Sequence, residues 1–67
     1  MRIHVNGQPQ ELPDHPTSIA DLLARLELAG KRIAIECNGE VVPKSRHGQT
    51  AVADGDRFEI IVAVGGG

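Results

Sequence analysis

The last three residues of the 67-residue chain are Gly65, Gly66 and Gly67, and they follow directly after an apolar alternating segment that ends at Val64. Glycine adds no side chain to a core and loses the most conformational entropy when it is ordered. A frayed end without a role is the common explanation for such a terminus. The chemical alternative is that three extended residues, which reach on the order of 10 Å, carry a carboxylate into another protein's narrow active site.

A carboxylate delivered in this way could be activated there. A free carboxylate is a poor acyl donor, whereas an acyl-adenylate made with ATP has a good leaving group. A sulfur nucleophile could then convert the Gly67 carboxylate into a thiocarboxylate, whose exposed sulfur can be passed on. In this interpretation Gly67 is the modified residue, and Gly65 and Gly66 give it access to the partner.

Other residues that carry out chemistry are few. The single cysteine cannot form an internal disulfide or a Cys-rich zinc site, and the alternation around Cys37 predicts a buried thiol with no cation beside it. The three histidines, His4, His15 and His47, lack metal-ligand spacing and are expected to face solvent. We therefore expect no metal site and no bound cofactor, with ATP consumed by the activating partner.

Composition and charge exclude several classes of protein. Seven Lys and Arg against nine Asp and Glu give a net charge of −2, and Phe58 is the single aromatic residue, so a nucleic-acid surface with clustered cations and stacking platforms is not expected. No apolar run reaches the roughly 18 residues of a membrane span, and the start shows no signal-peptide pattern. A short, cysteine-poor chain of this kind is expected to be cytoplasmic and monomeric when free. Because it has room for one small core, a carrier or binding module is favoured over an enzyme.

Alternation and turn signals predict the elements that would position the three glycines. Residues 1–12 are predicted to form a hairpin around Asn6-Gly7, with its second strand at a sheet edge because Pro9 lacks a backbone donor. Ser18 begins a capping box before a helix of about ten residues that is expected to end at Gly30. The apolar stripe of this helix comprises Ile19, Leu22, Leu23 and Leu26.

The second half of the chain is predicted to be mainly extended. A strand over 33–37, a short one at 41–43, a loop or 3₁₀ turn over 44–50 and a hairpin arm starting at 51–52 precede the final strand. The first and last strands can pair in parallel because a crossover containing the helix separates them. The expected fold is therefore α+β: a mixed sheet of four to five strands with one main helix on one face, the β-grasp arrangement. Residues 1–64 would form the domain and 65–67 a flexible tail.

The final strand carries apolar residues on both of its faces. The helix-covered face is predicted to take Phe58, Ile60, Val62 and Val64. Ile61 and Ala63 then point the other way, either into a second buried face or into an exposed apolar patch of the kind that marks binding sites. Because one helix cannot cover both faces of a sheet, we expect Ile61 and Ala63 to form a partner-docking surface.

Three segments in this order resemble one known family. They are MRIHVNG at residues 1–7, NGEVVP at 38–43, and the DGD turn at 54–56 that leads to IIVAVGGG at 60–67. Together they are similar to the ThiS family, the sulfur carriers of thiamine biosynthesis, whose terminal Gly-Gly is matched by Gly66 and Gly67. The resemblance implies a β-grasp, ubiquitin-like fold and a protein cosubstrate rather than an enzyme.

The resemblance also implies partners. A ThiF-type adenylyltransferase would adenylate Gly67, a sulfur donor protein would supply the sulfur, and a ThiG-type thiazole synthase would receive it. Three alternatives stay open: a molybdopterin-synthase-type sulfur carrier, a ubiquitin-like modifier whose Gly67 is joined to a substrate lysine, and a β-grasp interaction module with an idle tail.

Overall fold

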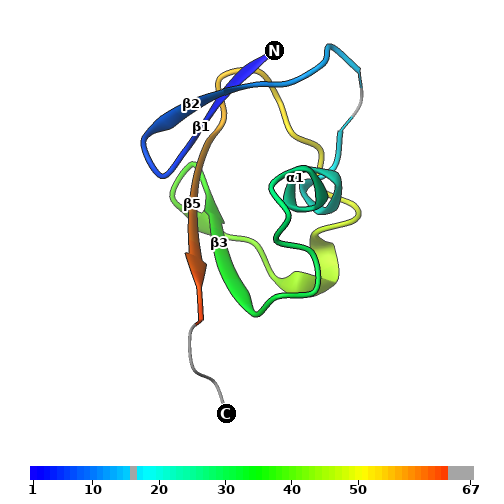
Figure 1. The fold of residues 1–67 in the computed structure, drawn as a ribbon, viewed down its shortest axis with the longest axis vertical. Coiled ribbons are helices and arrows are strands. Elements are labelled where there is room, and N and C mark those ends of the chain that lie inside the picture. The colour runs from blue at the N-terminus through cyan, green and yellow to red at the C-terminus, as the bar shows by residue number, and fades with distance from the viewer. Residues whose placement is uncertain (16, 64–67) are drawn as a thin grey trace.

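The structure is a computed structural model that describes residues 1–15 and 17–63 (Figure 1). Its elements in chain order are β1 (Arg2–Val5), β2 (Gln8–Glu11), α1 (Ile19–Arg25), β3 (Ile33–Cys37), β4 (Glu40–Val41), the 3₁₀ helix η1 (Lys44–Arg46) and β5 (Arg57–Val62). Across the described residues the strands form one sheet in the order β2-β1-β5-β3-β4. The pairing of β1 with β5 is parallel and the other pairings are antiparallel. Helix α1 lies on one face of this sheet, which confirms the predicted α+β, β-grasp architecture.

The first hairpin has the predicted register. Val5 lies opposite Gln8, as the two-residue loop requires, and Asn6 and Gly7 take φ values of 51° and 81°, the positive values of a type I′ turn. Strand β2 lies at the sheet edge, where the missing N–H of Pro9 is tolerated.

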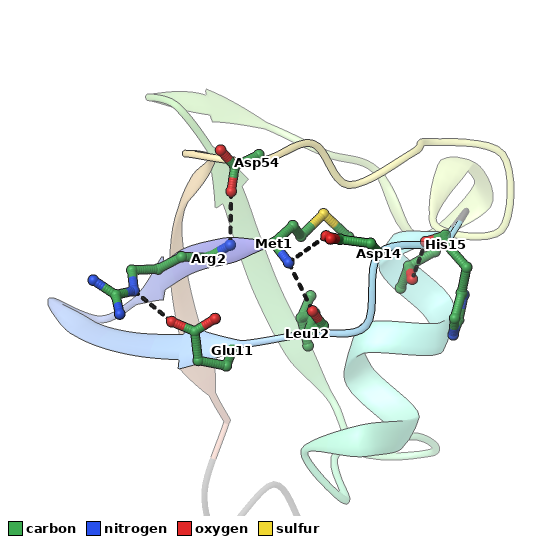
Figure 2. A network of polar contacts seen from close by, with 8 residues as sticks. Met1, Arg2, Glu11, Leu12, Asp14, His15 and Asp54 are labelled. Carbon is green, nitrogen blue, oxygen red and sulfur yellow. Dashed lines mark hydrogen bonds and ion pairs between the residues drawn. The ribbon is translucent and has the colours of Figure 1, made fainter.

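Polar contacts tie the start of the chain to the segment after β2 (Figure 2). The amino group of Met1 donates to the Leu12 carbonyl at 2.8 Å and to the Asp14 carboxylate at 2.6 Å. The hydrogen bond to Asp14 raises the pKa of the Met1 amine, and the same contact lowers the pKa of the Asp14 carboxyl. Beside it, the Arg2 guanidinium pairs with Glu11 across the hairpin.

Helix α1 begins as predicted and ends early. The Ser18 hydroxyl accepts from the Asp21 N–H at 3.1 Å, and the Asp21 carboxylate accepts from the Ser18 N–H at 3.1 Å, which completes the capping box. The helix spans seven residues, and its stop is not the predicted Gly30. Glu27 takes the left-handed conformation at φ 60°, and the Leu28 N–H donates to the Leu23 carbonyl at 2.8 Å, the bond of a Schellman cap.

The segment after η1 packs against the first turn of α1, a contact that the sequence pattern did not predict. Val52 does not begin a hairpin arm: its N–H donates to the Thr17 carbonyl at 2.8 Å, beside an isolated bridge from Ser18 to Ala51. His4 and His47 were both expected to face solvent, but His4 is half-buried, with its Nδ1 buried and without a hydrogen-bond partner. His47 is 8% exposed, and its Nε2 lies 3.1 Å from the Val42 carbonyl. The sequence pattern had no information on this tertiary contact.

The core lies between α1 and the sheet. Its buried apolar residues come from both layers and from the connecting segments: Ile3, Val5, Leu12, Ile19, Leu22, Leu23, Ile35, Val52, Phe58 and Ile60. The predicted helix stripe is thus buried at three positions, and Leu26 packs against the core from its margin.

Candidate functional site

Strand β5 is the element that leads to the three glycines. It lies between β1 and β3 in the middle of the sheet, and it pairs with β3 from Phe58 to Val62. Beyond the strand, the Ala63 N–H donates to the Arg32 carbonyl at 2.9 Å. The predicted tail residues, 65–67, lie outside the described residues, as does Val64. The structure therefore describes the chain up to Ala63, which we call the base of the tail.

On the β1 side, an asparagine side chain holds β5. The backbone ladder from β1 reaches Phe58, and the Asn6 N–H then donates to the Phe58 carbonyl at 2.8 Å. The Asn6 side chain continues the ladder: its Oδ1 accepts from the Ile60 N–H at 2.7 Å, and its Nδ2 donates to the Ile60 carbonyl at 3.0 Å.

On the β3 side, the second Asn-Gly turn makes a related contact. The Asn38 N–H donates to the Arg57 carbonyl at 2.7 Å, and Asn38 Oδ1 accepts from the Arg57 N–H at 3.0 Å. Its Nδ2 donates to the Asp56 carboxylate at 3.0 Å. Sequence reasoning treated Asn6 and Asn38 as turn residues and missed these contacts; the signal that could have indicated them is the repeated Asn-Gly pair directly after a strand.

The outer face of the sheet carries an exposed apolar patch. Ile61 is 66% exposed and Val41 is 72% exposed. Pairing of Ile61 with Ala34 and of Glu36 with both Val41 and Glu59 places these side chains on one face. We call the set of Ala34, Val41, Ile61 and Ala63 the outer patch.

The two residues predicted to form a docking surface, Ile61 and Ala63, both belong to the outer patch. Ile61 and Ala63 are both exposed and point away from α1, as predicted. Val62, predicted on the covered face with Phe58 and Ile60, is 37% exposed, because it lies past the end of the core. Sequence reasoning did not include Val41 in this surface.

Cys37 is half-buried at the end of β3. Burial raises the pKa of its thiol, and the nearby Asp56 carboxylate raises it further. A raised pKa leaves less of the nucleophilic thiolate, which fits a packing role for Cys37, although its thiol is half-buried against the core and not fully buried as predicted. Among residues 1–15 and 17–63 no group of three or more His, Cys, Asp or Glu side chains could hold a metal ion.

The same described residues include no helix that is both long and apolar enough to span a membrane.

Comparisons with known proteins agree with this architecture. Residues 3–67 match the ThiS family model. The chain is 34% identical over 65 residues to the sulfur carrier protein ThiS of Bacillus subtilis, covering 97% of this chain and 98% of that protein. It is also 39% identical over 67 residues to a thiazole synthase of Paramagnetospirillum magneticum; the match covers all of this chain but spans 20% of that protein.

A solved structure shows the same fold. The crystal structure of the thiamine biosynthesis protein ThiS from Geobacter metallireducens superposes with a TM-score of 0.83 at 33% sequence identity, and each chain is covered completely. A fold with β5 at its centre and a family match that continues through the final glycines lead to one conclusion: this chain belongs to the ThiS family.

Proposed function

We propose that this chain is a sulfur carrier for thiamine biosynthesis and that the Gly67 carboxylate is the group that carries the sulfur. The observation that supports it most strongly is the similarity to the Bacillus subtilis sulfur carrier, which runs over 98% of that protein. The family match through residue 67 includes the glycines on which the chemistry depends.

The proposed chemistry uses the carboxylate twice. First, a Gly67 carboxylate oxygen attacks the α-phosphate of ATP on a ThiF-type adenylyltransferase, which releases pyrophosphate and leaves an acyl-adenylate. Second, a sulfide equivalent from a sulfur donor protein attacks the acyl carbon, and AMP leaves with its bonding electron pair. The product is a thiocarboxylate on Gly67. This chain acts as a cosubstrate, and the catalytic groups belong to its partners.

A ThiG-type thiazole synthase is the proposed acceptor of the sulfur. The thiazole synthase of Paramagnetospirillum magneticum contains a segment similar to all 67 residues of this chain. The presence of such a segment within a thiazole synthase supports a functional pairing of this chain with an enzyme of that kind.

The outer patch is the proposed docking surface. Holding three glycines in a partner's active site costs about 1–2 kcal/mol each in backbone entropy, so the folded domain has to supply most of the affinity. Ile61 precedes Gly65 by four positions and is 66% exposed, and burying such a side chain against a partner is favourable. Docking there would place the base of the tail at the partner's active site.

Replacing Ile61 by aspartate tests this surface. Ile61→Asp should keep the fold because the side chain is exposed, and it should weaken binding to the ThiF-type and ThiG-type partners by about 2 kcal/mol. Gln8→Asp is the control: it adds the same charge at an exposed position of the edge strand β2, outside the outer patch, and the affinity should stay within about twofold of wild type. Calorimetric affinities that are unchanged for Ile61→Asp would move the docking surface elsewhere.

Adenylation can be tested by ATP–pyrophosphate exchange. A ThiF-type enzyme should exchange labelled pyrophosphate into ATP when this chain is added, and it should not do so with a chain that lacks both Gly66 and Gly67 and therefore no longer ends in Gly-Gly. Exchange that does not depend on this chain would contradict the proposed first step.

A further inference from the structure

The charges of this chain are divided between two regions. Segments 22–35 and 42–53 carry five of the seven Lys and Arg and one of the nine Asp and Glu, a net charge of +4. The other residues carry two Lys and Arg and eight Asp and Glu, a net charge of −6. The overall value of −2 therefore conceals a basic region, which comprises the second half of α1, its connection to β3, the start of β3 and the segment around η1.

The cations of the basic region lack acidic partners. Within the described part of the chain, the ion pairs are those of the Met1 amine with Asp14 and of Arg2 with Glu11, both outside this region. The acidic residue within the region is Glu27. Folding leaves a net positive charge here that no ion pair compensates.

A groove lies in the middle of the basic region. Its volume is about 410 Å³. Leu23, Leu28 and Ile33 supply apolar lining, and Lys31, Arg32 and Lys44 supply cations, all exposed. His47 also lines it, but its Nε2 is held by the Val42 carbonyl. We call this feature the basic groove.

The basic groove lies next to the base of the tail. The carbonyl of Arg32, one of its lining residues, accepts from the Ala63 N–H at 2.9 Å. The outer patch lies on the opposite face of the sheet from α1, whereas the basic groove lies on the α1 side. A partner that binds the tail beyond Ala63 would therefore lie close to both the outer patch and the basic groove.

We propose that the basic groove binds an acidic segment of the thiazole synthase, with one apolar side chain of that segment in the groove and its carboxylates against Lys31, Arg32 and Lys44. The combination of an apolar lining and unpaired cations fits a peptide of this composition. Lys and Arg heads on exposed stems can reach a carboxylate without the cost of burying a lone charge. This inference rests on the proposed function, because the partner is the protein that takes sulfur from Gly67.

Charge reversal tests the electrostatic part. Lys31→Glu and Lys44→Glu should each weaken binding of this chain to the thiazole synthase by about three- to tenfold at low salt, and the loss should shrink at high salt because exposed charges are screened. Arg2→Glu is the matched control: it changes the charge by the same amount but lies outside the basic region. Its affinity should stay within about twofold of wild type, as expected for a charge remote from the contact.

Filling the groove tests the apolar part. Ala29 lines the groove and is exposed, so Ala29→Phe should occupy the space and weaken binding by about tenfold or more, with the thermal melt of the free protein as the check on folding. If Ala29→Phe does not fold, Lys31→Glu and Lys44→Glu still test whether the thiazole synthase binds the basic groove.

The outcomes separate the two proposals. A wild-type chain that forms no thiocarboxylate and does not bind the synthase would contradict the proposed function. A wild-type chain that does both, with Lys31→Glu and Lys44→Glu binding as tightly as Arg2→Glu, would overturn the basic groove as the binding site. Sedimentation in which these substitutions abolish self-association instead would assign the groove to the acidic region of a second copy and would also overturn it.

Discussion

Replacing Asn6 by glycine should remove a side chain that holds β5 without disturbing the turn that carries it. Asn6 has a φ of 51°, which glycine adopts freely, so the backbone of the type I′ turn is kept. The substitution removes the 2.7 Å and 3.0 Å hydrogen bonds to the N–H and carbonyl of Ile60. At a net value of about 1 kcal/mol for each bond, the expected loss is about 2 kcal/mol in the free energy of unfolding.

The second Asn-Gly turn supplies a matched control. Asn38→Gly adds the same chain entropy to the unfolded state and starts from a similar φ of 52°, so the entropic part of the change cancels in the comparison. The side-chain contacts of Asn38 with Arg57 and Asp56 are exposed, where water replaces a lost bond. We therefore expect Asn38→Gly to cost about 1 kcal/mol less than Asn6→Gly.

Urea denaturation followed by far-ultraviolet circular dichroism measures both losses. Amide hydrogen exchange then provides a local measurement, because the Ile60 N–H donates to Asn6 and should lose more protection than the Phe58 N–H in the Asn6→Gly protein. Equal losses of stability for the two variants, or an Ile60 amide that remains protected, would refute the role assigned to Asn6.

Three further changes test other parts of the account. Leu23→Ala should cost about 2–5 kcal/mol, because Leu23 is 6% exposed in the core; in a domain with about 3–5 kcal/mol of stability a urea midpoint close to wild type would show that the α1 packing is misassigned. Glu27→Gly should raise the stability by about 0.5–1 kcal/mol, because a residue with a Cβ is strained at φ 60°; a lower thermal midpoint would contradict this cap. Asp14→Asn should lower the free energy of unfolding most between about pH 4 and about pH 8, which are the ordinary pKa values of an aspartate carboxyl and of a terminal amine. The lowered pKa of Asp14 makes its contribution disappear as pH falls, and the raised pKa of the Met1 amine makes it disappear as pH rises; a pH-independent difference between Asp14→Asn and wild type would contradict the ion pair.

Local signals predicted a large part of this fold. The Asn6-Gly7 turn fixes the register of the first hairpin through backbone geometry alone, and the Ser18 capping box satisfies the N–H groups at the start of α1 within four residues. Alternation placed Ile61 on the outer face because successive side chains of a strand point to opposite faces. Features of this kind depend on neighbours in the sequence.

Features that depend on tertiary contacts could not be predicted in this way. Helix α1 ends at Arg25 and not near Gly30, because Glu27 accepts a strained conformation that a glycine would normally provide. His47 is buried because the segment that begins there packs against the first turn of α1, where the His47 carbonyl accepts from the Ala20 N–H at 2.9 Å. The basic groove likewise joins segments that are more than ten residues apart. The pattern of a single strand or helix contains no information on such pairings.

The intact mass of this chain after incubation with ATP, a ThiF-type adenylyltransferase and a sulfur source tests the central claim most directly. We expect the mass to rise by the difference between one sulfur and one oxygen atom. The change should map to Gly67, and it should be lost when Gly66 and Gly67 are both removed, because the chain then no longer ends in Gly-Gly. An unchanged mass under conditions in which the enzyme is active, or a conjugate of this chain with a larger protein, would contradict a sulfur-carrier function.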